Sequence, residues 1–184
     1  MSNSTRLAKK SIVILATDGF EQSELFEPKE KLENMGANVT VVSINGNTSI
    51  KGWDQNEWVK KCPVDAQVED VNVDDFDALV LPGGQMNPDL LRNNSTAVQF
   101  VRDAASSDNI KSIAAICHAP WMLIEADLVA GKNIASFPSI KKDVENAGAS
   151  WVNRAVVRDG KLITSRNPDD IPYFVNEIAD LVAG

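Results

Sequence analysis

The chain of 184 residues carries a net charge of −8, with 43% hydrophobic and 24% charged residues, which are values typical of one globular domain. It has no extended basic cluster and no apolar run of membrane-spanning length, which excludes nucleic acid and membrane as expected partners. The polar N-terminus lacks a signal-peptide core, and two cysteines make no disulfide framework, so we expect a cytoplasmic protein.

Strand-like and helix-like segments alternate along the chain, which predicts an α/β fold with a mostly parallel sheet and helices on both faces. Strand-like runs cover 11–16, 38–44, 77–81, 112–116 and 132–137, and helical patterns cover 21–35, 95–105, 119–126, 140–146 and 168–182. Ser95 is the expected N-cap of its helix. Residues 50–75 are less regular, and Asp159-Gly160 predicts a hairpin between 151–158 and 161–165.

Cys117 and His118 stand between a strand-like run and a helical one, and His118 is the only histidine of the chain. A nucleophile at such a turn is raised above the sheet and faces the positive end of the helix, a field that favours the reactive thiolate. The alternative is an inert core thiol, because free cysteine is among the most buried residue types. The turn and the nearby acidic residues favour catalysis.

The remaining cysteine, Cys62, lies in a polar stretch without acid-base neighbours and is interpreted as incidental. One histidine and two scattered cysteines are too few ligands for a zinc site of the usual kind. The sequence therefore predicts no metal and no cofactor.

Acidic and glycine residues follow two other strands, at the sheet edge where ligands bind in this fold class. Glu21 and Glu24 share one face of the first helix, so either could donate a hydrogen bond to Cys117 or move a proton, although acidic residues are ordinary in a first helical turn. Gly83 and Gly84 form either a simple turn or, with the N–H of His118, a site for a developing oxyanion.

Asp89, in the sequence Asn87-Pro88-Asp89, is a candidate carboxylate to orient His118, from this chain or from a neighbouring subunit. A solvated turn aspartate is an equally good interpretation of that residue. Adjacent residues at a sharp turn project in different directions, so the sequence leaves open how squarely His118 faces the Cys117 sulfur.

Several motifs in order along the chain resemble the ThiJ/PfpI superfamily, in particular its PfpI-like intracellular protease and stress-protein branch. They are Phe20-Glu21-Gln22-Ser23-Glu24, the run from Phe76 to Gly84, Ala115-Ile116-Cys117-His118-Ala119-Pro120, Asn146-Ala147-Gly148-Ala149, and the run from Thr164 to Asp170. Ala119 stands where the family usually has glycine, and Asp89 where protease-type members have glutamate.

The resemblance implies a single PfpI-like domain over 1–184, a flavodoxin-like three-layer sandwich, a cysteine on a nucleophile elbow, a glutamate beside it, and a homodimer or larger homo-oligomer. Within the pair of glutamates, it favours Glu21 as the one closer to Cys117. The activities it implies are glutathione-independent glyoxalase or deglycase action on reactive carbonyls. Two alternatives remain: a cysteine peptidase that uses Cys117, His118 and Asp89, and a redox-sensing or chaperone-like stress protein with an oxidisable Cys117.

Overall fold

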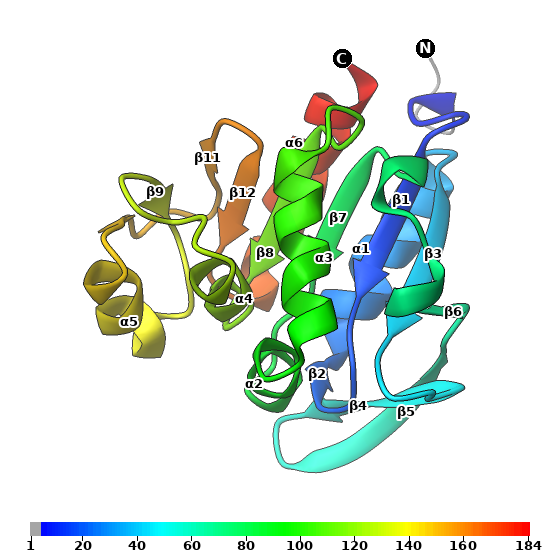
Figure 1. Ribbon diagram of the computed structural model, residues 1–184, viewed down its shortest axis with the longest axis horizontal. Helices are drawn as coiled ribbons and strands as arrows, with labels where there is room; N and C mark the ends of the chain where they lie inside the picture. Colours follow the sequence, from blue (N-terminus) through cyan, green and yellow to red (C-terminus); the bar gives the residue numbers. More distant parts are fainter. Residues whose placement is uncertain (1–4) are drawn as a thin grey trace.

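The computed structural model describes residues 5–184 and shows three layers, with a twisted sheet between two layers of helices (Figure 1). Residues 1–4, part of the polar N-terminal segment, lie outside the described residues. The seven-stranded sheet confirms the predicted α/β fold, because all its strands run parallel except the edge strand β11. Its strands in spatial order are β11 (Val157–Asp159), β12 (Leu162–Ser165), β8 (Ser112–Ile116), β7 (Ala78–Leu81), β1 (Ser11–Leu15), β3 (Asn38–Ser43) and β6 (Ala66–Gln67).

Side chains alternate across the central strands, as the pleat of a strand requires. In β1, Ile12 and Ile14 enter one apolar cluster, whereas Val13 and Leu15 enter the other. Helices α1 (Gln22–Asn34) and α6 (Ile171–Ala183) cover the first cluster, and α2 (Met86–Arg92), α3 (Ser95–Ser106), α4 (Pro120–Glu125) and α5 (Lys141–Asn146) cover the second. The sheet is therefore buried on both faces, which explains its continuous apolar runs.

Two smaller sheets flank the central one. The hairpin of β4 (Ser49–Asp54) and β5 (Glu57–Pro63) pairs with β2 (Phe20–Glu21), and β9 (Asn133–Ile134) pairs with β10 (Ser150–Trp151). The hairpin lies across the carboxyl end of β1, at the bottom of Figure 1. It therefore forms a wall beside the edge where ligands bind in this fold class.

Local details of the prediction differ from the structure. The hairpin around Asp159-Gly160 is confirmed, but its first strand is only Val157–Asp159 and not 151–158. Asn94, and not Ser95, caps α3, because its side chain accepts the Ala97 N–H at 2.9 Å. Only Asn133–Ile134 of the expected strand 132–137 pairs as a strand. Helix α2 was not expected; its Pro88 lies in the first turn, where a missing N–H costs no hydrogen bond.

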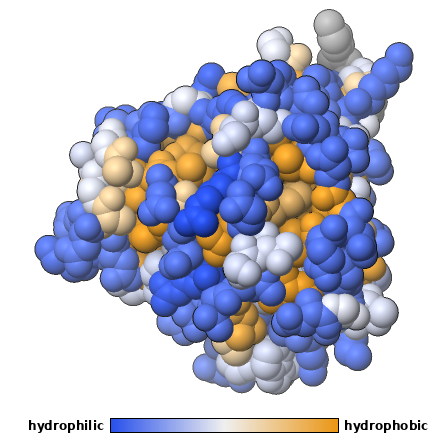
Figure 2. Space-filling model, in the orientation of Figure 1, coloured by the Kyte–Doolittle hydropathy of each residue, from blue (hydrophilic) through white to orange (hydrophobic). Residues whose placement is uncertain are grey.

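The outer surface is mostly polar but also exposes some apolar side chains. The face in Figure 2 is largely hydrophilic, with apolar side chains visible between the charged ones. Within residues 5–184, none of the helices combines the length and the apolar character needed to cross a membrane.

Replacing Phe174 by alanine is expected to lower the free energy of unfolding by about 3–5 kcal/mol, because its fully buried ring fills the space between α6 and the sheet. The neighbouring Tyr173 is 58% exposed on the same helix, so Tyr173→Ala should change it by less than about 0.5 kcal/mol. Urea unfolding measures both variants, and equal losses would contradict this account of the core.

Candidate active site

Cys117 occupies the turn between β8 and α4 with a left-handed backbone, φ +65°. That conformation is unfavourable for a residue with a side chain and persists where the surroundings impose it. Here the Cys117 N–H donates to Ser165 O at 3.0 Å, and its carbonyl accepts the Phe137 N–H at 2.8 Å. Ala119 has ordinary helical angles (φ −59°, ψ −25°), so glycine is not required there.

Glu24, in the first turn of α1, lies beside the Cys117 side chain. Its carboxyl group is completely buried, and Oε2 accepts the Gly83 N–H at 2.9 Å. Among the described residues Oε1 has no partner within the usual hydrogen-bond distance, and the carboxyl group interacts with the Cys117 side chain. The carboxyl group is therefore placed to exchange a proton with the sulfur.

Glu21 lies farther out, so the expectation that it would be the closer glutamate is wrong. Its backbone belongs to β2 and pairs with Trp53, which leaves the side chain half-buried at the wall of the pocket. The Ser23 hydroxyl donates to it at 3.4 Å. Glu24, in the first turn of α1, is the glutamate that is buried against the sheet.

The protonation of the Glu24–Cys117 pair is governed by burial. Burial raises the pKa of Glu24 to about 8, the negative charge of Glu21 adds to this, and the Gly83 N–H opposes it. Burial also raises the pKa of the Cys117 thiol, whereas the N–H groups of Gly84 and His118 act in the opposite direction. Burial therefore acts against the thiolate-favouring field expected at this turn, and a carboxyl group with a pKa of about 8 is mostly protonated at neutral pH.

His118 does reach the sulfur: its Nδ1 lies 3.2 Å from Cys117 Sγ, and its Nε2 lies 3.1 Å from Ser139 Oγ. The imidazole stacks on Phe137 with ring centroids 4.9 Å apart and meets the edge of Trp121 at 5.3 Å. Burial lowers the pKa of His118, so the ring is neutral at neutral pH. The sequence contained no signal for either neighbour, because Phe137 ended the expected strand 132–137 and Ser139 lay between that strand and the expected helix 140–146.

The two glycines of the loop after β7 have different tasks. A Cβ at Gly83 would lie 2.5 Å from Glu24 Oε2 and 2.7 Å from Cys117 Cβ, so only glycine fits between them. Its N–H is committed to Glu24, which removes it from the predicted oxyanion site. Gly84, with φ +80°, presents its N–H toward the sulfur together with that of His118.

Asn87, which sequence reasoning did not identify as important, joins two loops of the site. The side chain is fully buried; its Oδ1 accepts the Thr17 N–H at 2.7 Å, and its Nδ2 donates to Pro82 O at 2.8 Å. Thr17 follows β1 and Pro82 follows β7. The Asn87 side chain therefore links the loop that leads from β1 toward α1 to the loop that contains Gly83.

Asp89 is not brought to His118 within the described chain. It is exposed on α2 and forms an ion pair with Arg92 at 3.0 Å. The Arg92 guanidinium lies 4.6 Å from the ring centre of Trp121, whose edge meets His118. Asp89 therefore lies two side chains away from the imidazole it was expected to orient.

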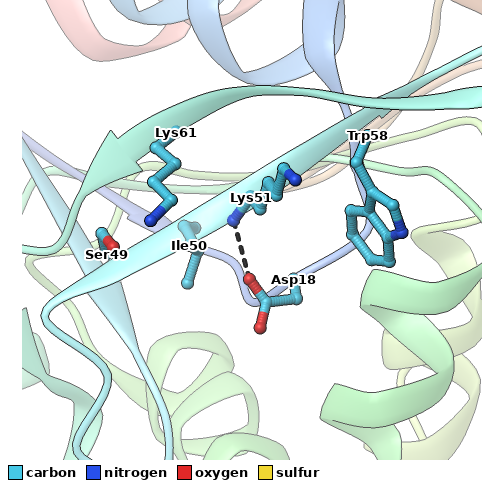
Figure 3. Close-up of a pocket in the computed structure, with 6 residues that line it drawn as sticks. All are labelled: Asp18, Ser49, Ile50, Lys51, Trp58 and Lys61. Atoms are coloured by element: carbon cyan, nitrogen blue, oxygen red, sulfur yellow. Dashed lines mark hydrogen bonds between the residues drawn. The ribbon is translucent and has the colours of Figure 1, made fainter.

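Cys117 lies in a pocket of about 660 Å³. Its other lining residues come from β2, α1, the hairpin, the loop after β7 with the start of α2, the turn after β8, the segment after β9 and the loop after β12; they are Glu21, Glu24, Trp53, Gln55, Trp58, Gly84, Gln85, Met86, His118, Phe137 and Pro168. A second pocket of about 360 Å³ shares the Trp58 side chain and contains Lys51 and Lys61, cross-strand neighbours whose side chains diverge in Figure 3.

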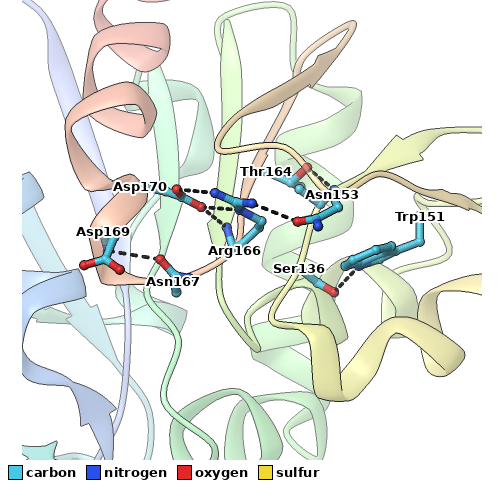
Figure 4. Close-up of polar contacts among 9 residues, drawn as sticks. Ser136, Trp151, Asn153, Thr164, Arg166, Asn167, Asp169 and Asp170 are labelled. Atoms are coloured by element: carbon cyan, nitrogen blue, oxygen red, sulfur yellow. Dashed lines mark hydrogen bonds and ion pairs between the residues drawn. The ribbon is translucent and has the colours of Figure 1, made fainter.

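The loop that carries Pro168 is held by an arginine (Figure 4). Arg166 donates to both oxygens of the buried Asp170 at 2.8 and 2.9 Å, and to Asn153 Oδ1 at 2.8 Å. A bidentate pair of this kind restrains geometry as well as contributing energy. It keeps this wall of the pocket in place.

Comparison with known proteins matches residues 10–181 to the DJ-1/PfpI family. The Bacillus subtilis protein named "Putative cysteine protease YraA" is 38% identical, over 94% of this chain and 98% of that one. Escherichia coli Protein/nucleic acid deglycase 2 is 37% identical, over 94% and 98% of the two chains. The crystal structure of Drosophila melanogaster DJ-1beta superposes with a TM-score of 0.84 at 32% identity, over 95% and 91%.

This chain therefore belongs to the DJ-1/PfpI family, as its motifs suggested, and it has the flavodoxin-like fold of that family.

The stability of the wild type relative to Glu24→Gln is expected to fall by roughly 3–5 kcal/mol between pH 5 and pH 9. The folded-state pKa of Glu24, about 8, is above the ordinary value of 4.5, so folding favours the protonated form. Its contribution is complete below about pH 4.5 and is lost as the pH rises through 8.

Urea unfolding at a series of pH values measures that difference, with Glu57→Gln as a control on an exposed carboxylate of the hairpin. A constant difference between the wild type and Glu24→Gln across this range would contradict a protonated buried Glu24.

Proposed function

We propose that this protein is a cysteine-dependent enzyme that converts reactive 2-oxoaldehydes to hydroxy acids without glutathione, and that removes the same carbonyls from early adducts on proteins. The observation that carries the proposal is the pair of Cys117 and a protonated, fully buried Glu24 at one pocket. A buried carboxyl with a pKa of about 8 can both give and take a proton near neutral pH.

The reaction begins when the Cys117 thiol loses its proton to His118 and the thiolate adds to the aldehyde carbon. Glu24 donates its proton to the carbonyl oxygen, which completes a hemithioacetal. The resulting carboxylate then moves the proton from that carbon to the adjacent carbon, and the hydroxyl proton moves to the neighbouring oxygen, so that a thioester forms. Water attacks the thioester, its hydroxyl completes the hydroxy acid, and its other proton goes to the departing sulfur. The proton held by His118 returns to Glu24, which restores the thiol, the protonated carboxyl group and the neutral imidazole.

The negative oxygen of the intermediate would face the N–H groups of Gly84 and His118, which already point toward the sulfur. Such donors stabilise charge without having to reorganise during the reaction. The pocket of about 660 Å³ is open at the exposed side chains of Trp58 and Phe137, which gives access to a carbonyl carried on a protein side chain.

A second candidate, a cysteine peptidase, is supported by the 3.2 Å contact between Cys117 Sγ and His118 Nδ1. That dyad is the arrangement by which a histidine activates a thiol. The third member of the predicted triad, Asp89, pairs with Arg92 in this chain, so this candidate depends on a carboxylate from a second copy.

Purified protein should convert methylglyoxal to lactate, measured by NMR or an enzyme-coupled assay. Cys117→Ser should lower kcat/KM by at least about 10³-fold, and Glu24→Gln by about 10²- to 10⁴-fold, because the nucleophile and the proton carrier are lost. Glu21→Gln should leave kcat/KM within about threefold of the wild-type value, since Glu21 affects Glu24 only through its charge.

Cys62→Ser is the matched control for the loss of a thiol, because Cys62 is buried in β5 outside the pocket. Absence of lactate with the wild type, together with cleavage of a fluorogenic peptide that Asp89→Ala abolishes, would replace the proposal by the peptidase.

A further inference from the structure

We propose that Asn87 is a positioning residue that fixes the direction of two backbone N–H groups at the site, those of Gly83 and Gly84. This inference deepens the proposed function and rests on it for the catalytic role of the two groups. Asn87 lies in the first turn of α2, and its side chain is completely buried. It is not among the residues that line the pocket, so it acts through the loop after β7.

The orientation of the Asn87 amide group follows from its partners. Its oxygen accepts the Thr17 N–H at 2.7 Å, and a backbone N–H can only donate. The other side of the amide is therefore the NH₂ group, which has two hydrogens to give. It donates to the Pro82 carbonyl at 2.8 Å and to the Gly83 carbonyl at 3.2 Å. One side chain thus holds two successive carbonyl groups of the loop.

Each of these carbonyls belongs to the same peptide unit as one of the two N–H groups. A trans peptide is planar, so its C=O and its N–H point in opposite directions. The Pro82 carbonyl faces the amide, and the Gly83 N–H on its far side donates to Glu24 Oε2 at 2.9 Å. The Gly83 carbonyl also faces the amide, so the Gly84 N–H of the next unit points away from it, toward the pocket of the nucleophile.

A pair of glycines needs such a restraint. Without side chains, the peptide between Gly83 and Gly84 can rotate with little steric resistance. Bulkier residues are excluded, because a Cβ at these positions would lie 2.5 and 2.4 Å from a neighbouring atom. The Gly83 carbonyl also accepts the Glu21 N–H, at a longer distance of 3.3 Å. The loop therefore depends on hydrogen bonds for its geometry, and Asn87 supplies two of them.

The alternative is that Asn87 only links the loops after β1 and β7. Both roles predict a less stable protein without the amide, so stability alone does not decide between them. Burial raises the pKa of Glu24, and the Gly83 N–H opposes that rise. Burial likewise raises the pKa of the Cys117 thiol, and the Gly84 N–H opposes it. Only the positioning role predicts that both groups lose this opposition, whichever form the sulfur takes at rest.

Glu24 and Cys117 titrate together, so each is measured with the other replaced by an uncharged residue. In Glu24→Gln, the pH profile of iodoacetamide labelling at Cys117 should move to higher pH when Asn87→Ala is added. In Cys117→Ser, the ¹³C signal of the Glu24 carboxyl group should titrate at higher pH when the same change is added. Glu21 and His118 remain in place in every one of these full-length proteins.

Asn94→Ala is the matched control in both backgrounds. The Asn94 side chain accepts the Ala97 N–H at 2.9 Å at the start of α3, so its loss should lower stability and leave both titrations unchanged. Titrations that stay at the same pH in folded Asn87→Ala would overturn the proposal. Equal movements in Asn94→Ala and Asn87→Ala would overturn it too, because they would show a general effect of destabilisation.

The wild type provides a test that needs no replacement. In ¹³C,¹⁵N-labelled protein, couplings across the hydrogen bonds should connect the Asn87 side-chain nitrogen to the carbonyl carbons of Pro82 and Gly83. Absence of the coupling to Gly83 would mean that the Gly84 N–H is not held in this way. That result would overturn the proposal even where Asn87→Ala does not fold.

The rate of the proposed reaction gives a separate measurement. Asn87→Ala should lower kcat for methylglyoxal by about 10- to 10²-fold and leave KM within about threefold, because an oxyanion donor acts in the transition state. Rates are expressed per Cys117 that reacts with iodoacetamide, so unfolded protein is not counted. Absence of lactate with the wild type counts against the proposed function alone, since the titrations use no substrate. An active wild type and an Asn87→Ala protein of equal kcat would overturn this inference alone.

Discussion

The hydrogen bond from Gly83 N–H to the buried Glu24 carboxyl is the interaction on which the rest of the site depends. It joins α1 to the loop after β7, and it places both beside the turn that carries Cys117. Any side chain at position 83 would occupy the space of the carboxyl and of the cysteine Cβ. A carboxyl with one neutral donor and no cation beside it keeps its proton, so the same packing that closes the site also determines its acid-base chemistry.

The backbone around Cys117 shows how the fold maintains an unfavourable conformation. Strands β1, β7, β8 and β12 of the central sheet end at the site, and β12 and the segment after β9 each form a hydrogen bond with the Cys117 backbone. The side-chain amide of Asn87 fixes the loops after β1 and β7 in the same way. Several independent contacts thus share the cost of one positive φ, about 1–2 kcal/mol. The site is made of strand ends and not of one long loop.

Much of the fold was predictable, because β1, β3, β7 and β8 are buried on both faces and appear as apolar runs. Cys117, Glu24 and Gly84 were also found, since strand ends in a parallel sheet converge. The choice between Glu21 and Glu24 was not predictable from helical spacing, because it depends on β2 pairing with the hairpin. Ser139 and Asn87 were missed for a related reason: a single polar residue has no periodicity, and its role depends on contacts with residues distant in sequence, His118 for Ser139 and Thr17 for Asn87.

A thiol that is protonated at rest is consistent with a nucleophile that must persist in a cell. Oxidation proceeds through the thiolate, so burial that raises the pKa of Cys117 also slows its loss to oxidants. The intrinsic nucleophilicity of a thiolate increases with the pKa of its thiol. A thiol with a high pKa that loses its proton to a neighbour therefore gives a more reactive thiolate than a thiol with a low pKa. In the proposed mechanism the thiol therefore depends on His118 and Glu24 to move its proton before it can react. Under that proposal, burial protects the sulfur, and its hydrogen-bonded neighbours determine when the proton leaves.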